Sequence, residues 1–330
     1  MKHLQLFIGI GISLTCGYFA VRGVTWGAVW EAFAKVHLLM LLPGIGCLGL
    51  MFLVRAYRWR RFVEPFQAVP FTPFLSATLI GFMANDILPL RAGELIRVYV
   101  LSHLASVRLS TVLATLVLER VWDTVGVSVL LVVLLLSFPI PAWLAHANLV
   151  LLGGSLLILG GGWFFVYRGT AGLSWLPPRL AIVAGHFIQG FSALQNFSLV
   201  LWVFVLSVLV WVMFILFYWI VLQACGFALP VTAALMVTVL TVFAAALPAA
   251  PGYLGTFQYA TVLALSFFSV PKEEALGFSL VAHLGQLLPV IVAGLIALAR
   301  ARLPLWPGRV TTADQSHEQL EKSPAASPPA

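Results

Sequence analysis

The chain has 330 residues, of which 62% are hydrophobic and 9% are charged, and its mean hydropathy is +1.04. This composition excludes a soluble globular protein and is typical of a membrane protein that crosses the bilayer several times. The net charge is +7, but the basic residues lie at the ends of apolar segments, which indicates membrane orientation and not nucleic-acid binding. Cys16, Cys47 and Cys225 lie in or beside apolar stretches without paired spacing, so we expect no disulfide framework, metal site or cofactor.

Six apolar stretches have the length that crosses the hydrocarbon core of a bilayer, which is about 17 to 25 residues. The first follows Lys2 and has no small-residue cleavage site after it, so we expect an uncleaved helix. The six predicted spans are residues 4–21, 36–54, 111–138, 149–167, 199–222 and 275–299.

Two further apolar stretches, residues 74–101 and 231–270, are interrupted near the middle by proline, and the second also by glycine. Non-helical backbone at membrane depth persists only where protein or water satisfies its hydrogen bonds. We therefore predict two broken re-entrant hairpins in an all-α polytopic fold of six spanning helices and about eight hydrophobic segments. Residues 1–303 are expected to form one transmembrane domain, and residues 304–330 a disordered cytoplasmic tail.

Basic residues predict the orientation. The densest cluster, Arg55, Arg58, Arg60 and Arg61, follows the second span and predicts a cytoplasmic loop by the positive-inside rule. The same rule places these later arginines in the cytoplasm: Arg108, Arg168, Arg179, Arg300, Arg302 and Arg309. Both termini are then cytoplasmic, and the charges after Lys272 are external. One hairpin enters from each side, so the two halves form an inverted repeat, which predicts a binding site near the membrane midplane.

The first hairpin carries four charged residues around Asn85 and Pro89, namely Asp86, Arg91, Glu94 and Arg97. A charged side chain near the bilayer centre costs about 2.5 to 3.5 kcal/mol on insertion scales, so it needs a partner, water or a bound polar ligand. Pro89 suits the first turn of a helix, which places Arg91, Glu94 and Arg97 on one face. The helix start and the two arginines would bind an anion such as a phosphate headgroup, with Glu94 orienting the arginines. Alternatively, Arg91, Glu94 and Arg97 pair with one another and only fix the hairpin at the interface.

The third predicted span contains Glu119, Arg120 and Asp123, whose spacing makes one polar patch. Without partners these charges would cost roughly 8 kcal/mol, so the patch must pack against another polar element, most simply the first hairpin. There Arg91 or Arg97 would neutralise the acids. The patch either extends a polar track for a substrate or forms a buried ion network that locks the helices together.

The second hairpin breaks around Pro251, Gly252 and Gly255. We expect Gly252 and Gln258 to belong to the site, with Gln258 capping the re-entering helix and able to donate to a headgroup. Alternatively, the prolines and glycines of the second hairpin only kink a membrane helix and form no binding site. His283, in the last span, is by itself typical of a hydrogen-bonded core residue.

These residues together resemble the flippase-like transmembrane family, the membrane region shared with lysylphosphatidylglycerol synthases. The resemblance extends from the first span to about Ala299 and rests on Asn85, Leu88-Pro89, Arg91-Ala92-Gly93-Glu94, Arg97, Glu119-Arg120, Asp123, Pro251-Gly252 and Leu254-Gly255. It implies a bacterial or archaeal inner-membrane protein that moves lipids or lipid-linked polar groups between leaflets.

The chain departs from the family pattern in the second hairpin and the last span. Tyr253 interrupts the glycine-rich turn, Gln258 replaces a glutamate that is common there, and His283 stands where an arginine is often found. Ion coupling or substrate choice at the second hairpin is therefore not carried over. The sequence after Arg309 is short, polar and rich in Pro, Ala and Ser. It is not expected to be an aminoacyl-transferase domain, so we expect no lysyl transfer and no enzyme activity.

The function expected is an inner-membrane translocator of a lipid or lipid-linked headgroup, in the bacterial cytoplasmic membrane. Its expected substrate-binding residues are Asn85, Arg91, Glu94, Arg97, Glu119, Arg120, Asp123, Gly252 and Gln258. The expected partners are anionic or polyprenyl-phosphate-linked membrane lipids and a separate glycosyltransferase or synthase, without nucleic acid. The alternatives are a membrane-embedded transferase subunit, with Asp86, Glu94 or Glu119 as base, and a scaffold for envelope lipid or glycan synthesis.

Overall fold

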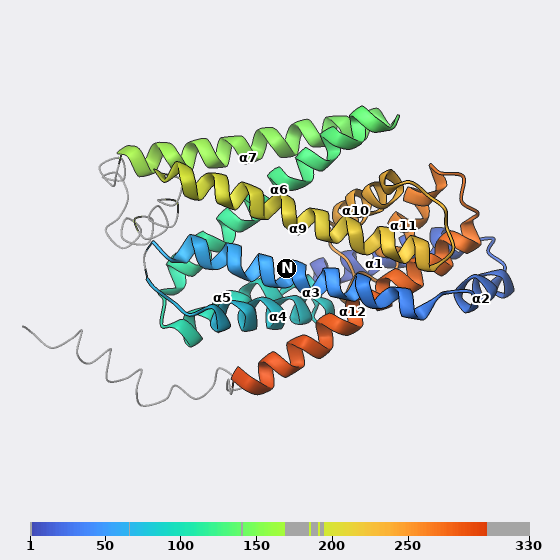
Figure 1. Cartoon of the computed structure of the whole chain (residues 1–330), viewed down its shortest axis with the longest axis horizontal. Helices are drawn as coiled ribbons and strands as arrows, with labels where there is room; N and C mark the ends of the chain where they lie inside the picture. Colours follow the sequence, from blue (N-terminus) through green and yellow to red (C-terminus); the bar gives the residue numbers. More distant parts are fainter. Residues whose placement is uncertain are drawn as a thin grey trace, which may run out of the picture.

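The computed structural model describes residues 2–65, 67–139, 141–168, 185, 191 and 195–301, and the regular structure in this part of the chain is helical. Its α-helices are α1 (Lys2–Val21), α2 (Trp26–Ala34), α3 (Leu41–Val63), α4 (Phe71–Ile87), α5 (Gly93–Ala105), α6 (Leu109–Ser137), α7 (Ala142–Arg168), α9 (Phe197–Ala224), α10 (Val231–Ala246), α11 (Thr256–Ser266) and α12 (Lys272–Ala301). Its short 3-10 helices include η1 (Leu38–Met40), η2 (Pro89–Arg91) and η5 (Pro251–Tyr253). Figure 1 shows α3 and α9 running side by side along the molecule.

Five helices in the described chain are long and apolar enough to cross a membrane, namely α3 with η1, α6, α7, α9 and α12. A sixth is counted if α1 and α2 form one span, although the two helices are bent by 86° at their junction. Large apolar side chains of α7, such as Leu149, Leu157 and Tyr167, are exposed on the outside of the molecule. Such a surface fits contact with lipid, so the expected all-α polytopic membrane fold is confirmed.

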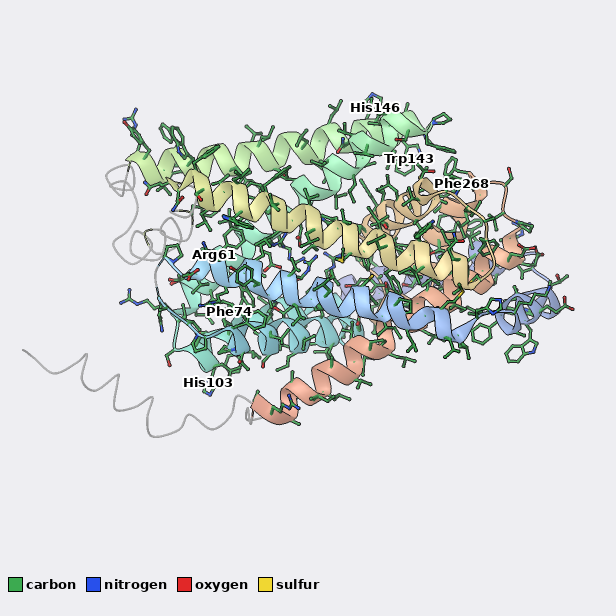
Figure 2. The ribbon with its side chains drawn as sticks, in the orientation of Figure 1. Arg61, Phe74, His103, Trp143, His146 and Phe268 are labelled. Carbon is green, nitrogen blue, oxygen red and sulfur yellow. The ribbon has the colours of Figure 1, made fainter. Side chains whose placement is uncertain are left out.

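The two ends of the molecule carry different loops. Figure 2 shows Arg61, Phe74 and His103 at one end, and Trp143, His146 and Phe268 toward the other. We call these the Arg61 end and the Trp143 end. The first hairpin, α4–η2–α5, starts and finishes at the Arg61 end, whereas the second, α10–η5–α11, starts and finishes at the Trp143 end (Figure 1). The hairpins therefore enter from opposite ends, as the inverted repeat predicts.

The breaks in the two hairpins meet where η5 contacts α4. The first break follows Ile87, because Leu88 is extended (φ −98°, ψ 146°) and Pro89 has no N–H with which to continue the helix. The second contains Gly252 (φ +67°) and Gly255 (φ +86°). Glycine is the residue that adopts these angles without strain.

Helix α1 covers the second break. The Ser13 hydroxyl accepts a hydrogen bond of 2.8 Å from the backbone N–H of Ala250. A Cβ atom at Gly255 would overlap the carbonyl oxygen of Ser13. Bare glycine backbone at this position therefore allows α1 and the broken hairpin to approach each other closely.

One predicted boundary is wrong. Helix α3 does not end at residue 54 but continues to Val63, so Arg55 and Arg58 lie within it, with only 5% and 0% of their surfaces exposed. They are not cytoplasmic loop residues, because they find carboxylate partners inside the protein. Arg61 lies at the helix end and pairs with Glu64 at 2.7 Å. The predictions for Arg179, Arg302, Arg309 and the tail 304–330 lie outside the described residues.

Candidate functional site

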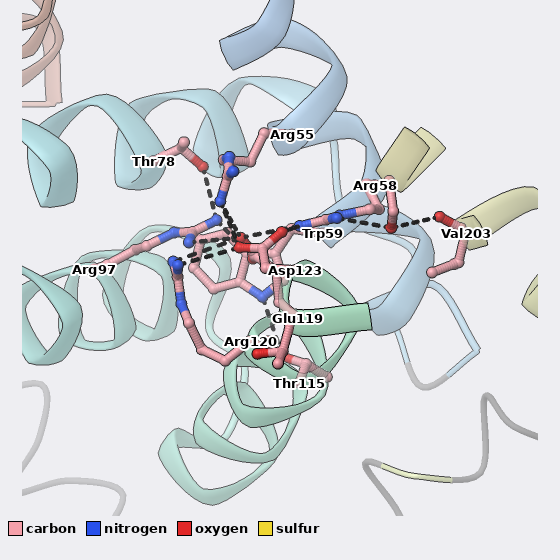
Figure 3. A network of polar contacts seen from close by, with 12 residues as sticks. Arg55, Arg58, Trp59, Thr78, Arg97, Thr115, Glu119, Arg120, Asp123 and Val203 are labelled. Atoms are coloured by element: carbon pink, nitrogen blue, oxygen red, sulfur yellow. Dashed lines mark hydrogen bonds and ion pairs between the residues drawn. The ribbon is translucent and has the colours of Figure 1, made fainter. Parts of the chain in front are cut away.

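Asp123 on α6 binds two arginines of α3. Its Oδ2 lies 2.7 Å from Arg55 Nη1, and its Oδ1 lies 2.5 Å from Arg58 Nη2. The two arginines are three residues apart, which places them on one face of α3. Arg58 also donates to the Ser207 hydroxyl of α9 at 2.8 Å. Figure 3 shows arginines from different helices converging on the carboxylates of α6.

Glu119, one turn earlier on α6, pairs with Arg97 of the first hairpin. The two side chains make a bidentate pair, with N–O distances of 2.9 Å and 2.8 Å. Arg97 also donates to Thr78 Oγ1 at 3.2 Å and lies over the Trp59 ring, 3.9 Å from the ring centre. The Glu119 side chain is 0% exposed and that of Arg97 is 1% exposed. The bidentate geometry, the hydrogen bond to Thr78 and the contact with the Trp59 ring hold this pair in place between the helices.

Arg120 connects these buried pairs to a more open region. Its Nη1 lies 3.1 Å from Asp123 Oδ2, and its Nη2 lies 3.1 Å from Glu94 Oε1. The Arg120 and Glu94 side chains are 38% and 26% exposed. Glu94 is at the start of α5, where the helix dipole favours an anion. Arg120 and Glu94 therefore form the accessible end of the network.

We define the charged network as Arg55, Arg58, Glu94, Arg97, Glu119, Arg120 and Asp123. Its formal charge is +1, because four arginines face three carboxylates. An uncompensated charge at membrane depth is costly, and an anion that reaches the accessible end would reduce this cost.

The sequence predicts that Arg91 shares one helix face with Glu94 and Arg97. This prediction is wrong, because the Arg91 side chain reaches the second hairpin instead. Its Nη2 donates to the Ala245 carbonyl oxygen, and its guanidinium lies within electrostatic reach of the Tyr253 side chain. Arg91 and Tyr253 both have positive φ, 53° and 55°. Such angles are unfavourable for residues with side chains, by about 1 to 3 kcal/mol each. The contact between the two breaks therefore involves a strained residue from each hairpin.

Glu94 and Arg97, the other two predicted site residues among the charges of the first hairpin, bind different partners. Glu94 binds Arg120, and Arg97 binds Glu119. Glu94 therefore orients Arg120 and not Arg91. The prediction that the third span packs against the first hairpin is confirmed, with Arg97 as the arginine that neutralises an acid of α6.

In the second hairpin, Gln258 caps α11 as predicted. Its Oε1 accepts from the Gly255 N–H at 2.7 Å, and its Nε2 lies 3.0 Å from His283 Nδ1. Gln258 and His283, two of the three positions at which this chain departs from the pattern it resembles, are thus neighbours that bind each other without a charge pair.

Asn85 and Gly252 lie where the hairpins meet. Asn85 is 9% exposed, and its Oδ1 has no hydrogen-bond partner among the described residues. A Cβ atom at Gly252 would lie 3.4 Å from the carbonyl oxygen of Asp86. Both residues therefore belong to the junction of the breaks and not to the charged network.

Sequence reasoning missed Arg55 and Arg58 as site residues. The available signal was that Arg55 and Arg58 are three residues apart among large apolar side chains such as Trp59, which indicates a buried helix face. Arg61, in contrast, has a nearby acidic partner, Glu64, three residues later. Within the described ranges, no group of three or more His, Cys, Asp or Glu side chains is placed to hold a metal ion.

Comparison with known proteins gives one match. The family model described as the lysylphosphatidylglycerol synthase TM region matches residues 6–294. No curated protein and no solved structure matches the chain. The matched interval contains both hairpins and every member of the charged network.

Proposed function

This chain belongs to the family of the lysylphosphatidylglycerol synthase transmembrane region, and from that premise we propose that it moves an anionic lipid or lipid-linked headgroup between the leaflets of a membrane. The observation that carries the proposal is the charged network, which brings four arginines and three carboxylates together inside a multi-pass membrane protein. Charged residues inside a membrane domain generally mark a substrate or ion pathway.

The accessible end of the network is the proposed headgroup site. Two guanidinium nitrogens of Arg120, Nε and Nη2, have no hydrogen-bond partner among the described residues, and the excess positive charge of the network attracts a phosphate. The start of α5 adds backbone N–H groups and the positive end of a helix dipole. The unpaired Oδ1 of Asn85 adds an acceptor for a headgroup hydroxyl or for water. Acyl chains would remain in the bilayer beside the apolar outer helices.

Burial divides the network into two roles. Arg58, Arg97 and Glu119 have 0 to 1% of their side-chain surface exposed, so they position the helices and the neighbouring charges. Arg120 and Glu94 retain exposed surface and are proposed to contact the headgroup. Removing a positioning residue should therefore damage the fold, whereas removing a contacting residue should damage lipid movement.

We propose the bacterial inner membrane as the location, with the Arg61 end in the cytoplasm. Helix ends at that end of the molecule carry arginine: Arg61 lies near the end of α3, Arg108 directly precedes α6, and Arg168 ends α7. By the positive-inside rule this end faces the cytoplasm. Anionic phospholipids or polyprenyl phosphates are the proposed lipid partners, because both present a phosphate to arginine.

Reconstituted vesicles test the proposal. The protein is placed in liposomes that contain phosphatidylglycerol with a fluorescent acyl chain, and dithionite reports how much of the label reaches the outer leaflet. Arg120→Gln removes a charge-assisted hydrogen bond to the phosphate, worth about 1.5 to 3 kcal/mol, so the rate should fall roughly tenfold or more. Arg120→Lys keeps the charge and should retain part of the rate.

Arg60→Gln is the matched control. Arg60 lies near the end of α3, its side chain is 33% exposed and its nearest carboxylate, on Glu64, is 4.0 Å away. It should move lipid at the wild-type rate. Equal rates in Arg120→Gln, Arg60→Gln and wild type, with equal monodispersity and helical content, would exclude Arg120 as a headgroup ligand. Wild-type vesicles no faster than empty ones would reject translocation of this lipid and favour a scaffold.

A further inference from the structure

Asp86 occupies the junction between the two broken hairpins. It lies in the last turn of α4, and its backbone carbonyl oxygen faces Gly252 in the second break. The end of a helix carries the negative pole of the helix dipole, so a carboxylate is disfavoured there. Asp86 is also partly buried. Its position therefore favours the neutral carboxylic acid over the anion.

Asp86 differs from the other acids at this depth. Glu94, Glu119 and Asp123 each lie within 3.1 Å of an arginine nitrogen. Within the described part of the chain, the Asp86 carboxyl group makes no ion pair and no hydrogen bond. An unpaired carboxylate near the bilayer centre costs about 2.5 to 3.5 kcal/mol, and binding a proton removes that cost.

The titratable groups of the neighbouring elements are already engaged with other partners. Arg91 of η2 binds the Ala245 carbonyl oxygen, and Tyr253 of η5 lies within electrostatic reach of both Arg91 and Asp86. On the neighbouring helices, Glu94 and Arg97 of α5 bind Arg120 and Glu119, and His283 of α12 binds Gln258. Arg55 and Arg58 of α3 both bind Asp123. Asp86 is therefore the carboxyl group at this junction that is free to gain and lose a proton.

The same junction contains the contact most suited to change. Arg91 of the first break donates to the Ala245 carbonyl oxygen beside the second break, and Arg91 and Tyr253, one from each break, both hold positive φ. Strained residues of this kind occur where two local arrangements compete. Any movement of one hairpin against the other must break or shift this contact, and it changes the surroundings of Asp86 at the same time.

We infer that Asp86 is the binding site of a proton that is transported together with the lipid. The inference rests on the proposed translocation. A carboxylate oxygen of Asp86 accepts a proton from water on one side of the membrane and becomes a neutral carboxylic acid. The hairpins then shift, and the acid releases the same proton to water on the other side. The proton is the only species gained and lost, and no bond of the lipid is made or broken.

The test imposes a pH gradient on vesicles that contain the protein and phosphatidylglycerol with a fluorescent acyl chain. Potassium and valinomycin hold the membrane potential at zero. One pH unit corresponds to about 1.4 kcal/mol per proton. With one proton for each lipid, the ratio of labelled lipid between the leaflets should shift about tenfold in the wild type. A pH-sensitive dye inside the vesicles should report proton entry when labelled lipid is added to one leaflet.

Asp86→Asn should move lipid when the pH is equal on both sides, but its lipid distribution should not follow the gradient. Asp86→Glu keeps a carboxyl group and should respond as the wild type does. Glu274→Gln removes an exposed carboxylate in the first turn of α12, away from this junction, and should also respond as the wild type does. A full response in Asp86→Asn would overturn the assignment.

The wild type alone separates the two proposals. Lipid movement at equal pH with no response to the gradient would overturn proton coupling and leave translocation standing. Absence of any lipid movement would overturn both. The wild-type measurement decides this even if Asp86→Asn fails to fold.

Discussion

Glu119→Gln should strongly destabilise the protein. Glu119 is 0% exposed, it binds Arg97 at 2.9 Å and 2.8 Å, and its Oε1 lies 3.6 Å from nitrogens of Arg55 and Arg58. Glutamine has nearly the same shape but no charge, so the buried Arg97 loses its counterion and the formal charge of the network rises from +1 to +2. Breaking one side of a buried pair in this way typically costs about 3 to 5 kcal/mol.

An exposed ion pair provides the comparison. Arg61 and Glu64 are 2.7 Å apart, but their side chains are 34% and 38% exposed. Water solvates both partners, so Arg61→Gln should change the free energy of unfolding by about 0 to 1 kcal/mol. The free energy is measured for the purified proteins by titrating dodecyl sulfate into mixed micelles, with tryptophan fluorescence and helical content as readouts.

A double variant tests the cause. Arg97→Gln with Glu119→Gln removes both charges, so no buried arginine is left without this partner. It should be less destabilised than either single variant. Equal losses for Glu119→Gln and Arg61→Gln would refute the reasoning that burial makes the network costly to break. A double variant that simply adds the two single losses would show that the pair is not coupled.

The remaining predictions concern the second break and the orientation. Gly255→Ala should lower the free energy of unfolding by about 1 to 3 kcal/mol, because its φ is +86° and the new Cβ would overlap Ser13. Gly11→Ala on α1 has nothing within 4 Å of the new Cβ and should be neutral or stabilising by up to about 1 kcal/mol, measured in the same titration. Cysteine at His146, in a chain without its native cysteines, should react with an impermeant maleimide outside spheroplasts, and cysteine at His103 only after lysis. Labelling of both from outside would contradict the opposite placement of the two ends.

Much of the architecture follows from local sequence. Long apolar runs specify membrane helices, because backbone hydrogen bonds must be satisfied within each segment in lipid. Proline at position 89 and glycine at positions 252 and 255 fix the breaks, because one removes a backbone donor and the others permit positive φ. The capping of α11 by Gln258 is also a local effect over three residues.

The end of α3 was predicted wrongly from hydropathy. A hydropathy profile places the end of the span before Arg55, because an arginine without a partner is unfavourable in lipid. In the protein the helix continues, since Asp123 lies opposite Arg55 and Arg58. A sequence profile scores each residue without its partner, so it does not register a charge that is neutralised 65 or 68 positions away.

The sequence by itself determined that the charges of the first hairpin and of α6 must be brought together, because an unpaired charge at membrane depth is energetically unfavourable. Only the tertiary structure decided the pairing: Arg97 with Glu119, Arg120 with Glu94, and Arg91 with the opposite hairpin. Ion pairing depends on distances of a few ångströms between side chains on different helices. Those distances are set by how the helices pack, which spacing along one helix does not specify.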